Sequence, residues 1–239
     1  MSLRIEKLPA LEAGFKNGLV DASGKKFKVV TSILSDVVSI RPVKEDYFYP
    51  TKTIKDSIVL HFTAGVLTGD ISALTTNHVS VPYVVARDGT IYELFDPHYW
   101  AYHLGSSKFY GNQDRSSKTI GIEISNIGPL TLKDDGILYD IYNKGYCKLE
   151  DADFFNKVDY RGYHYFASYT EAQYASVQKL LEQLTEKFKI AYEFVAPEKR
   201  FEFSKSVPHK GIVTHANYRG DKFDLAPNFD FEKIQQVKS

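Results

Sequence analysis

The sequence predicts an α/β layer fold, because apolar runs of strand length are interspersed with a clear amphipathic helix. The strand runs are rich in isoleucine and valine, and the best of them lie at 57–62, 119–124 and 211–215. The helix follows Thr170. In folds of this class, active groups collect at the ends of strands and in the loops that follow them.

Residues 1–50 read as an extension in front of the main domain. Short apolar runs at 28–30 and 36–38 are mixed there with glycine and proline, which favours strands or loops packed on that domain. The first firm strand is 57–62, a β-branched and apolar run that ends in small residues. His61 is therefore expected near a strand end.

A β-hairpin is predicted at 81–94, where two apolar runs flank the dipeptide Asp88-Gly89. This dipeptide supplies the positive backbone torsions of a tight turn, so the two strands are expected to be antiparallel neighbours. The run at 119–124 is a further strand. It places Glu123 among apolar neighbours, where a solvent-facing strand usually shows several polar residues, and this singles out the carboxylate.

The clearest helix begins after Thr170, which forms a capping-box pattern with Gln173. Apolar residues then recur at helical spacing, at Tyr174, Val177, Leu181, Leu184 and Phe188. The run at 211–215 is predicted as a short strand that again delivers a histidine, His215, at its carboxyl end.

Composition excludes several classes of function. The 30 basic residues balance 30 acidic residues, so no net field would hold the protein on nucleic acid or anionic lipid. The first residues lack the apolar core of a secretory signal and no run is long enough to cross a bilayer, so we expect a soluble protein synthesised in the cytoplasm.

Cys147 is the single cysteine, which excludes an intrachain disulfide. It is interpreted as an incidental thiol, because no neighbouring pattern indicates a base that would make it a nucleophile.

Three short segments carry residues whose chemistry fits together: His61, then Glu123, then His215 with Lys222 and Asp224. A catalytic zinc needs three protein ligands and an open position, and the two histidines with Asp224 supply such a set. Each residue also has a structural interpretation. Strand-end histidines often serve as hydrogen bonders, loop aspartates as turn formers, and single Glu or Lys residues as solvated charges. Spacing alone therefore leaves the function open.

In their order along the chain, these segments resemble the zinc amidase family that includes phage lysins, bacterial cell-wall amidases and the peptidoglycan recognition proteins. The resemblance runs from about residue 57 to residue 231. It rests on VLHFTAG, VPYVVARDGTIYEL, AYHLGSS, TIGIEISN, YTEAQYASVQKLLEQL and IVTHANYRGDKFDLAP. The resemblance implies a mixed central β-sheet flanked by helices, with zinc in a groove on one side.

The resemblance also implies roles for the candidate residues. His61, His215 and Asp224 would hold zinc, Glu123 would handle protons, and Lys222 would stabilise the oxyanion. The predicted activity is hydrolysis of the amide bond between N-acetylmuramic acid and L-alanine in peptidoglycan. The substrate partner is therefore peptidoglycan or a muropeptide, and neither nucleic acid binding nor membrane insertion is expected.

Three further features of the chain need an interpretation of their own. His103 in AYHLGSS is interpreted either as a substrate-binding or oxyanion-assisting residue, or as a structural hydrogen bonder. The last motif reads Asp224-Leu225-Ala226-Pro227 where Asp-Pro-Gly-Pro is common in the family. We expect a catalytic domain at 51–239 behind the extension at 1–50. Within it, an aromatic-rich insertion at 129–168 is predicted to complete a second small core, with a wall of the substrate groove as the alternative.

The biological setting that we expect is a phage-type lysin or cell-wall hydrolase. One alternative is a cytoplasmic amidase that recycles anhydromuropeptides. Another is a module that binds peptidoglycan without cutting it, although such relatives usually lack a zinc ligand and all ligand positions are filled here. An unrelated zinc peptidase is the remaining alternative, and it would cleave between amino acids.

Overall fold

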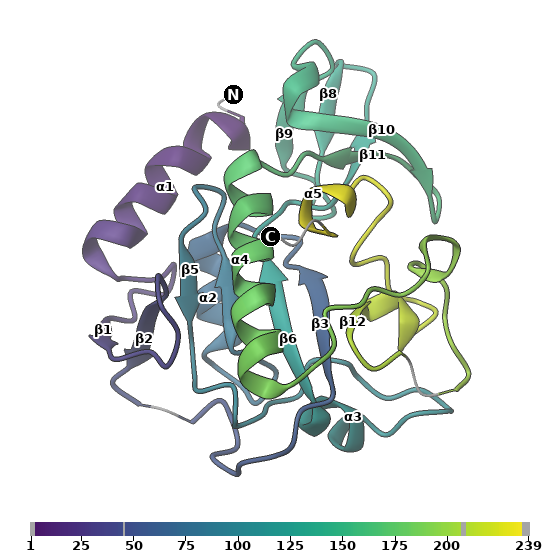
Figure 1. The fold of residues 1–239 in the computed structure, drawn as a ribbon. Helices are drawn as coiled ribbons and strands as arrows, with labels where there is room; N and C mark the ends of the chain where they lie inside the picture. Colours follow the sequence, from purple (N-terminus) through teal and green to yellow (C-terminus); the bar gives the residue numbers. More distant parts are fainter. Residues whose placement is uncertain (1–2, 45, 207–208, 236–239) are drawn as a thin grey trace.

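The computed structural model describes residues 3–44, 46–206 and 209–235 (Figure 1). A seven-stranded sheet with the strand order β1-β2-β5-β4-β6-β3-β12 forms its centre. The strands are β1 (Phe27–Val30), β2 (Val38–Pro42), β3 (Ser57–Phe62), β4 (Tyr83–Val85), β5 (Ile91–Glu93), β6 (Thr119–Ile124) and β12 (Ile212–Thr214). Pairing is parallel from β4 through β6 and β3 to β12, and antiparallel in β4–β5 and β1–β2.

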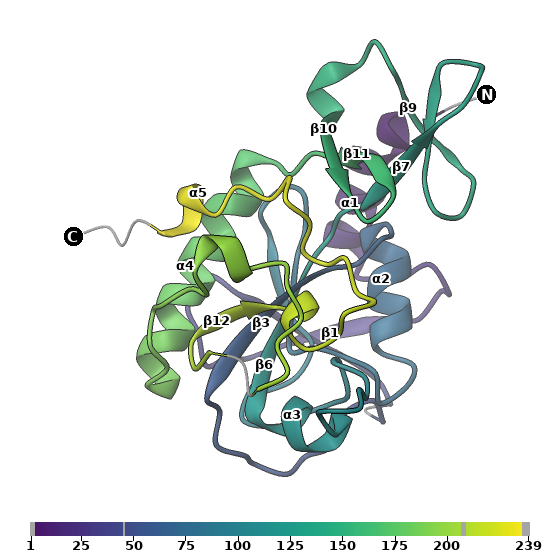
Figure 2. The ribbon, with the colours of Figure 1, turned by 90° about the vertical axis from the view of Figure 1, so that its right-hand side faces the viewer.

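Helices cover both faces of this sheet. α4 (Glu171–Phe188) and α2 (Leu67–Leu74) lie on opposite sides, as Figure 2 shows. α1 (Arg4–Gly18) contacts α2, α3 (Asn112–Lys118) immediately precedes β6, and α5 (Glu232–Gln235) contacts α4. The predicted α/β fold with a mixed central sheet between helices is confirmed. None of the helices in the described part of the chain is long and apolar enough to span a membrane.

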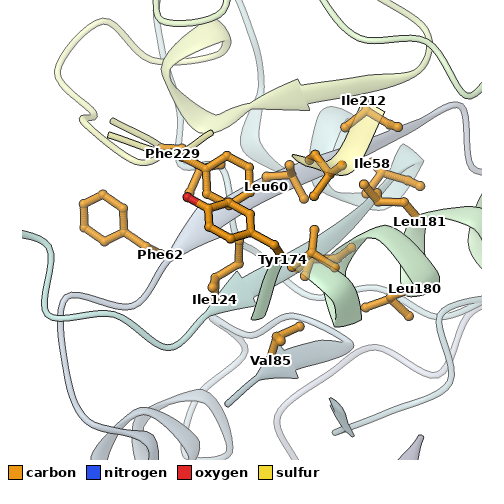
Figure 3. Packing of buried hydrophobic residues seen from close by; sticks show 14 of the residues in the cluster. Ile58, Leu60, Phe62, Val85, Ile124, Tyr174, Leu180, Leu181, Ile212 and Phe229 are labelled. Atoms are coloured by element: carbon orange, nitrogen blue, oxygen red, sulfur yellow. The ribbon is translucent and has the colours of Figure 1, made fainter. Parts of the chain in front are cut away.

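The strands divide their side chains between two environments, because successive residues of a strand point to opposite faces. Leu60 of β3 enters the main hydrophobic core, where it joins Leu181 of α4 (Figure 3). Ile122 of β6 belongs to the same core. His61 and Glu123 follow these residues and are register partners in the pair β3–β6. Their side chains therefore lie next to each other on the sheet face that is turned away from α4.

Two local predictions are confirmed. Thr170 caps α4: its hydroxyl accepts a hydrogen bond from Gln173 N at 3.1 Å, and Gln173 Oε1 accepts one from Thr170 N at 3.1 Å. The Asp88-Gly89 turn joins β4 and β5, and Gly89 has a φ of 85°. A β-carbon at Gly89 would also lie 2.9 Å from a backbone oxygen of α4, so the turn requires glycine.

The insertion at 129–168 forms a second, five-stranded sheet with the order β10-β11-β7-β8-β9. Its strands are β7 (Pro129–Leu132), β8 (Ile137–Tyr139), β9 (Gly145–Lys148), β10 (Phe155–Tyr160) and β11 (Tyr163–Ala167). Tyr146 is buried in a small core with Cys147, which confirms the second-core prediction for this tyrosine. Tyr142 is 61% exposed, and for it that prediction is wrong. Burial raises the pKa of the Cys147 thiol to about 12, which disfavours a nucleophilic role.

The extension at 1–50 differs in part from its prediction. β1 and β2 pair at the edge of the main sheet, as expected, but α1 is a 15-residue helix where the sequence predicts strands or loops. A proline and two glycines weaken the local helix signal. Leu8, Glu12 and Phe15 are buried at helical spacing, and α1 contacts both α2 and β9. Tertiary packing therefore stabilises this helix more than its own propensity does.

Candidate functional site

His61, His215 and Asp224 converge in the structure, although 154 and 163 residues separate His61 from the other two. The sheet brings the histidines together, because β12 pairs with β3 and Thr214 lies opposite Leu60, one residue before each histidine. The two Nδ1 atoms lie 3.1 Å apart, and Asp224 Oδ2 lies 2.9 Å from each of them. All three residues of this triad are buried.

The triad offers a donor set that fits zinc. Each histidine turns Nδ1 toward the other ligand atoms, while its Nε2 makes a hydrogen bond elsewhere, at 3.0 Å for His61 and 2.8 Å for His215. A tetrahedral zinc with bonds of about 2.0–2.1 Å would separate its ligand atoms by roughly 3.3 Å. The present separations of 2.9–3.1 Å are close to that value. The fourth position would stay open for water or substrate.

The charge states of the triad also suit a cation. Burial, with the neighbouring His215, lowers the pKa of His61 to about 4, so its imidazole is neutral at pH 7. Burial alone would raise the pKa of Asp224, but the adjacent histidines, His215 first, outweigh it and hold that pKa below its ordinary value. Neutral imidazole and ionised carboxylate are the forms that bind metal.

Glu123 lies beside His61 on the adjacent strand. Its Oε2 atom is buried and has no hydrogen-bond partner among the described residues. Burial raises the pKa of Glu123 well above its ordinary value, and the carboxylates of Asp224 and Asp70 raise it further, against the charge of Lys222. A divalent cation at the triad would also oppose this rise. An unpartnered carboxylate beside an open metal position is placed to exchange a proton with water there.

Lys222 is on the loop that leads to Asp224. The loop turns at this point, where the backbone N–H of Lys222 donates to Arg219 O at 3.1 Å. The half-buried ammonium lies close enough to the triad to lower the pKa of both His61 and Glu123. The structure thus brings the predicted basic residue to the same site as the predicted ligands and the predicted carboxylate.

His103 has both ring nitrogens occupied by the protein. Nδ1 lies 3.0 Å from His61 Nε2, and Nε2 lies 2.8 Å from the hydroxyl oxygen of Thr119. Desolvation, together with the charges of the two triad histidines, lowers the pKa of His103 well below its ordinary value, so the ring is neutral. These contacts favour the structural hydrogen-bonding interpretation of His103 over the substrate-binding one.

A cleft of about 420 Å³ opens beside Glu123. Its walls come from three parts of the chain: α2 with the loop before it, the start of α1, and the insertion. Arg4 of α1 and Lys144 of the insertion bring positive charge to the cleft, and Asp70 of α2 brings a carboxylate. The exposed ring of Tyr142 is a further part of the wall, so this insertion tyrosine fits the alternative interpretation.

Asp70 and Thr119 lie at the site but are not among the site residues predicted from the sequence. Asp70 accepts a hydrogen bond from Ser125 Oγ at 3.2 Å. It lies in a short apolar helix, and this sequence context does not indicate that its side chain lines a cleft. The position of Thr119 at the site could have been predicted from its spacing to Glu123. It lies four residues before Glu123 on the same strand, and the alternation of strand residues puts both on one face of the sheet.

Comparison with known proteins assigns a family to this arrangement. The family model described as N-acetylmuramoyl-L-alanine amidase matches residues 50–226. The chain belongs to this amidase family. The matched region contains the triad, Glu123, Lys222 and His103, whereas α1, β1 and β2 precede it. No curated protein matches the chain.

Solved structures are similar to this amidase-family chain at low sequence identity. AmiD from E. coli, in complex with anhydro-N-acetylmuramic acid-L-Ala-D-gamma-Glu-L-Lys, is 21% identical with a TM-score of 0.49, and the match covers 77% of this chain and 58% of AmiD. AmpDh3 from Pseudomonas aeruginosa, in complex with anhydromuramic pentapeptide, is 19% identical with a TM-score of 0.47 and coverages of 77% and 60%. LysC from Clostridium intestinale is 15% identical with a TM-score of 0.47 and coverages of 84% and 96%. The chain thus spans less than two thirds of the AmiD and AmpDh3 chains.

Proposed function

We propose that this protein is a zinc-dependent N-acetylmuramoyl-L-alanine amidase, which hydrolyses the bond between N-acetylmuramic acid and L-alanine in peptidoglycan. One observation carries the proposal. His61, His215 and Asp224 present ligand atoms within 4.8 Å of one another, beside the unpartnered carboxylate of Glu123. Membership of the amidase family supplies the substrate class.

Zinc held by the triad would supply the positive charge that polarises the scissile carbonyl and acidifies the attacking water. Glu123 accepts a proton from that water, since its carboxylate lies beside the triad and has no competing hydrogen bond among the described residues. It then donates the proton to the alanine nitrogen as the amide bond breaks. The raised pKa of Glu123 supports this second step, because an acid catalyst works best when its pKa lies near the operating pH.

The Lys222 ammonium stabilises the negative charge that develops on the carbonyl oxygen during attack. The influence of its charge on both His61 and Glu123 supports this role. The same ammonium interacts less strongly with the neutral carbonyl of the substrate. Lys222 therefore lowers the energy of the transition state more than that of the ground state.

The stem peptide occupies the cleft beside Glu123. Arg4 is oriented there by an ion pair with the buried Asp140 of the insertion, with 3.0 Å between Arg4 Nε and Asp140 Oδ2. Together with Lys144, it would place positive charge near a carboxylate of the peptide. In this assignment residues 51–239 are the catalytic domain, and the extension at 1–50 completes the substrate cleft.

The activity is tested on purified sacculi with mass analysis of the soluble products. The expected product is a stem peptide that begins with a free alanine amino group, released from intact muramic acid. Products cut between amino acids would indicate a peptidase instead. Binding to sacculi without any release, in a protein that holds zinc, would indicate a recognition module.

Two variants test the roles within the site. Glu123→Gln should keep stoichiometric zinc, measured by elemental analysis, while turnover falls about 10²- to 10⁴-fold through loss of proton transfer. The matched control is Glu12→Gln, which neutralises another buried glutamate in α1. Near wild-type turnover by Glu123→Gln would contradict its role. His215→Ala should lose the metal, and full zinc retention would contradict the ligand assignment.

The biological setting that we favour is a phage-type lysin or cell-wall hydrolase. The measurement that separates it from a recycling enzyme is the ratio of turnover on intact sacculi to turnover on soluble anhydromuropeptides. A wall hydrolase is expected to release stem peptides from sacculi efficiently. An enzyme that acts on the soluble fragments and leaves sacculi intact would belong to recycling.

A further inference from the structure

One short turn, His103-Leu104-Gly105, contacts the Nε2 atoms of both triad histidines. The His103 side chain lies against His61, with 3.0 Å between Nδ1 and Nε2. The backbone oxygen of Leu104 lies 2.8 Å from His215 Nε2. A single segment thus occupies the ring nitrogen of each histidine that points away from the triad.

The hydrogen bond to His215 has one possible direction. The Leu104 carbonyl has lone pairs but no hydrogen, so His215 must carry its hydrogen on Nε2 and donate it. In a neutral imidazole the other nitrogen then has a free lone pair. With Nε2 committed to the Leu104 carbonyl, Nδ1, which faces Asp224 and His61, is the nitrogen that His215 would offer as the acceptor atom to a bound metal.

The hydrogen bonds on the Nε2 side of His61 form a longer chain, through His103 to Thr119. Which group donates in each bond is determined by the last residue, Thr119. The hydroxyl of Thr119 donates to the backbone oxygen of Arg115 at 2.9 Å. Its single hydrogen is then used, so Thr119 accepts from His103 Nε2 at 2.8 Å. When the one hydrogen of the His103 ring lies on Nε2, Nδ1 accepts from His61 Nε2 at 3.0 Å. His61 therefore also carries its hydrogen on Nε2 and turns the Nδ1 lone pair to the triad.

The fold holds this turn from two sides. On α3, Ser116 Oγ accepts from His103 N at 3.2 Å, and Asn112 Oδ1 accepts from Gly105 N at 3.1 Å. On β6, Gly121 leaves room for the His103 ring, since a β-carbon there would lie 3.1 Å from His103 Nδ1. The position of the turn is thus set by α3 and β6 and not by the triad itself.

We propose that the His103–Gly105 turn, anchored on α3 and through Thr119 on β6, is the positioning element that presets both triad histidines as Nδ1 ligands before metal binds. The proposal rests on the proposed zinc site, and it assigns His103 and Thr119 to orienting His61 and not to contact with substrate. Ligand histidines that already have the right hydrogen placement bind metal without reorganisation. Outer hydrogen-bond partners of this kind typically contribute about 10- to 100-fold in metal affinity.

The central test compares Thr119→Val with Thr119→Ser in the full-length protein. Valine keeps the shape of threonine but removes the hydroxyl, whereas serine retains it. Thr185→Val is the matched control, because Thr185 is also buried and its hydroxyl makes the same type of bond, to Leu181 O at 2.7 Å. Zinc affinity is measured by competition with a chelator. We expect Thr119→Val to bind zinc about 10- to 100-fold more weakly, and Thr119→Ser and Thr185→Val to stay close to wild type.

A second readout reports on the hydrogen positions directly. Long-range ¹H–¹⁵N NMR spectra distinguish protonated from unprotonated ring nitrogens. In the chelator-treated wild type, His61 and His215 should both carry hydrogen on Nε2. Thr119→Val should give mixed forms for His61 and leave His215 unchanged. At position 103, His103→Asn should recover part of the affinity lost in His103→Ala, because the Asn oxygen lies near the place of Nδ1 and accepts from His61.

The outcomes separate this inference from the proposed function. Wild-type zinc affinity and an unchanged His61 hydrogen position in Thr119→Val would overturn the inference and leave the amidase proposal intact. Failure of the wild-type protein to bind zinc would instead remove the proposed zinc site. The spectra of the chelator-treated protein would still decide whether the hydrogen-bond chain runs from His61 through His103 to Thr119.

Discussion

Asp70 is expected to lower the stability of the fold at neutral pH. Burial raises the pKa of its carboxyl group from 3.8 to about 6, against hydrogen bonds from Thr63 and Ser125 that lower it. A group with a raised pKa in the folded state binds its proton more tightly there than in the unfolded chain. Its contribution to stability is therefore fully present below about pH 4 and is lost as the pH rises through about 6.

The size of the effect follows from the two pKa values. The gap between 3.8 and about 6 corresponds to roughly 3 kcal/mol of lost stability at pH 7.5, where both states are ionised. At pH 4.5 the folded group is still protonated and the unfolded group is just past its midpoint, so the loss is roughly 1 kcal/mol. Asp70→Asn removes the charge at every pH and keeps an oxygen that accepts from Ser125.

The variant should therefore gain about 2 kcal/mol relative to wild type between pH 4.5 and pH 7.5. The assay is urea unfolding of both proteins at the two pH values, with a chelator present so that metal release does not contribute. Asp134→Asn, at an exposed position, gives the background for removing one carboxylate from the surface. If the difference between Asp70→Asn and wild type is the same at both pH values, or narrows toward pH 7.5, burial does not penalise the charge of Asp70.

Three further changes test the packing that holds the site in place. Thr170→Ala should lower the free energy of unfolding by about 1 kcal/mol through loss of the α4 cap, while Thr170→Ser should retain most of it in the same urea assay. Leu181→Ala should cost about 2–5 kcal/mol, since this residue is fully buried between α4 and the sheet, and a loss under 1 kcal/mol in calorimetry would contradict the core assignment. Arg4→Leu should cost about 2 kcal/mol by leaving the buried Asp140 without its cation. Equal stability of Arg4→Leu and wild type in chemical unfolding would show that the ion pair does not tie α1 to the insertion.

Helices, strands and turns that are specified by a few neighbouring residues could be predicted from the sequence. A β-branched, apolar run identified β3, the Asp88-Gly89 dipeptide identified the turn between β4 and β5, and the capping box marked the start of α4. α1 escaped prediction because its buried residues find their partners on α2 and β9, which are distant in sequence. The strands of the insertion were likewise not predicted. Tyr146 is buried and Tyr142 lines the cleft because of the way in which that second sheet packs.

The sequence by itself determined the types of the candidate residues and their positions on or near strand ends. Through the six motifs, it also indicated the family whose site residues His61, Glu123 and His215 match. Tertiary structure alone decided that these residues share one face, because that follows from β12 and β6 flanking β3 in the sheet. It also supplied the contacts of His103 with His61 and Thr119, which favour the structural interpretation of His103 and arise where a turn folds back over β6. Backbone torsions and side-chain periodicity act between near neighbours in the chain, and therefore specify elements. Contacts across 154 residues depend on strand order and packing, which no local pattern contains.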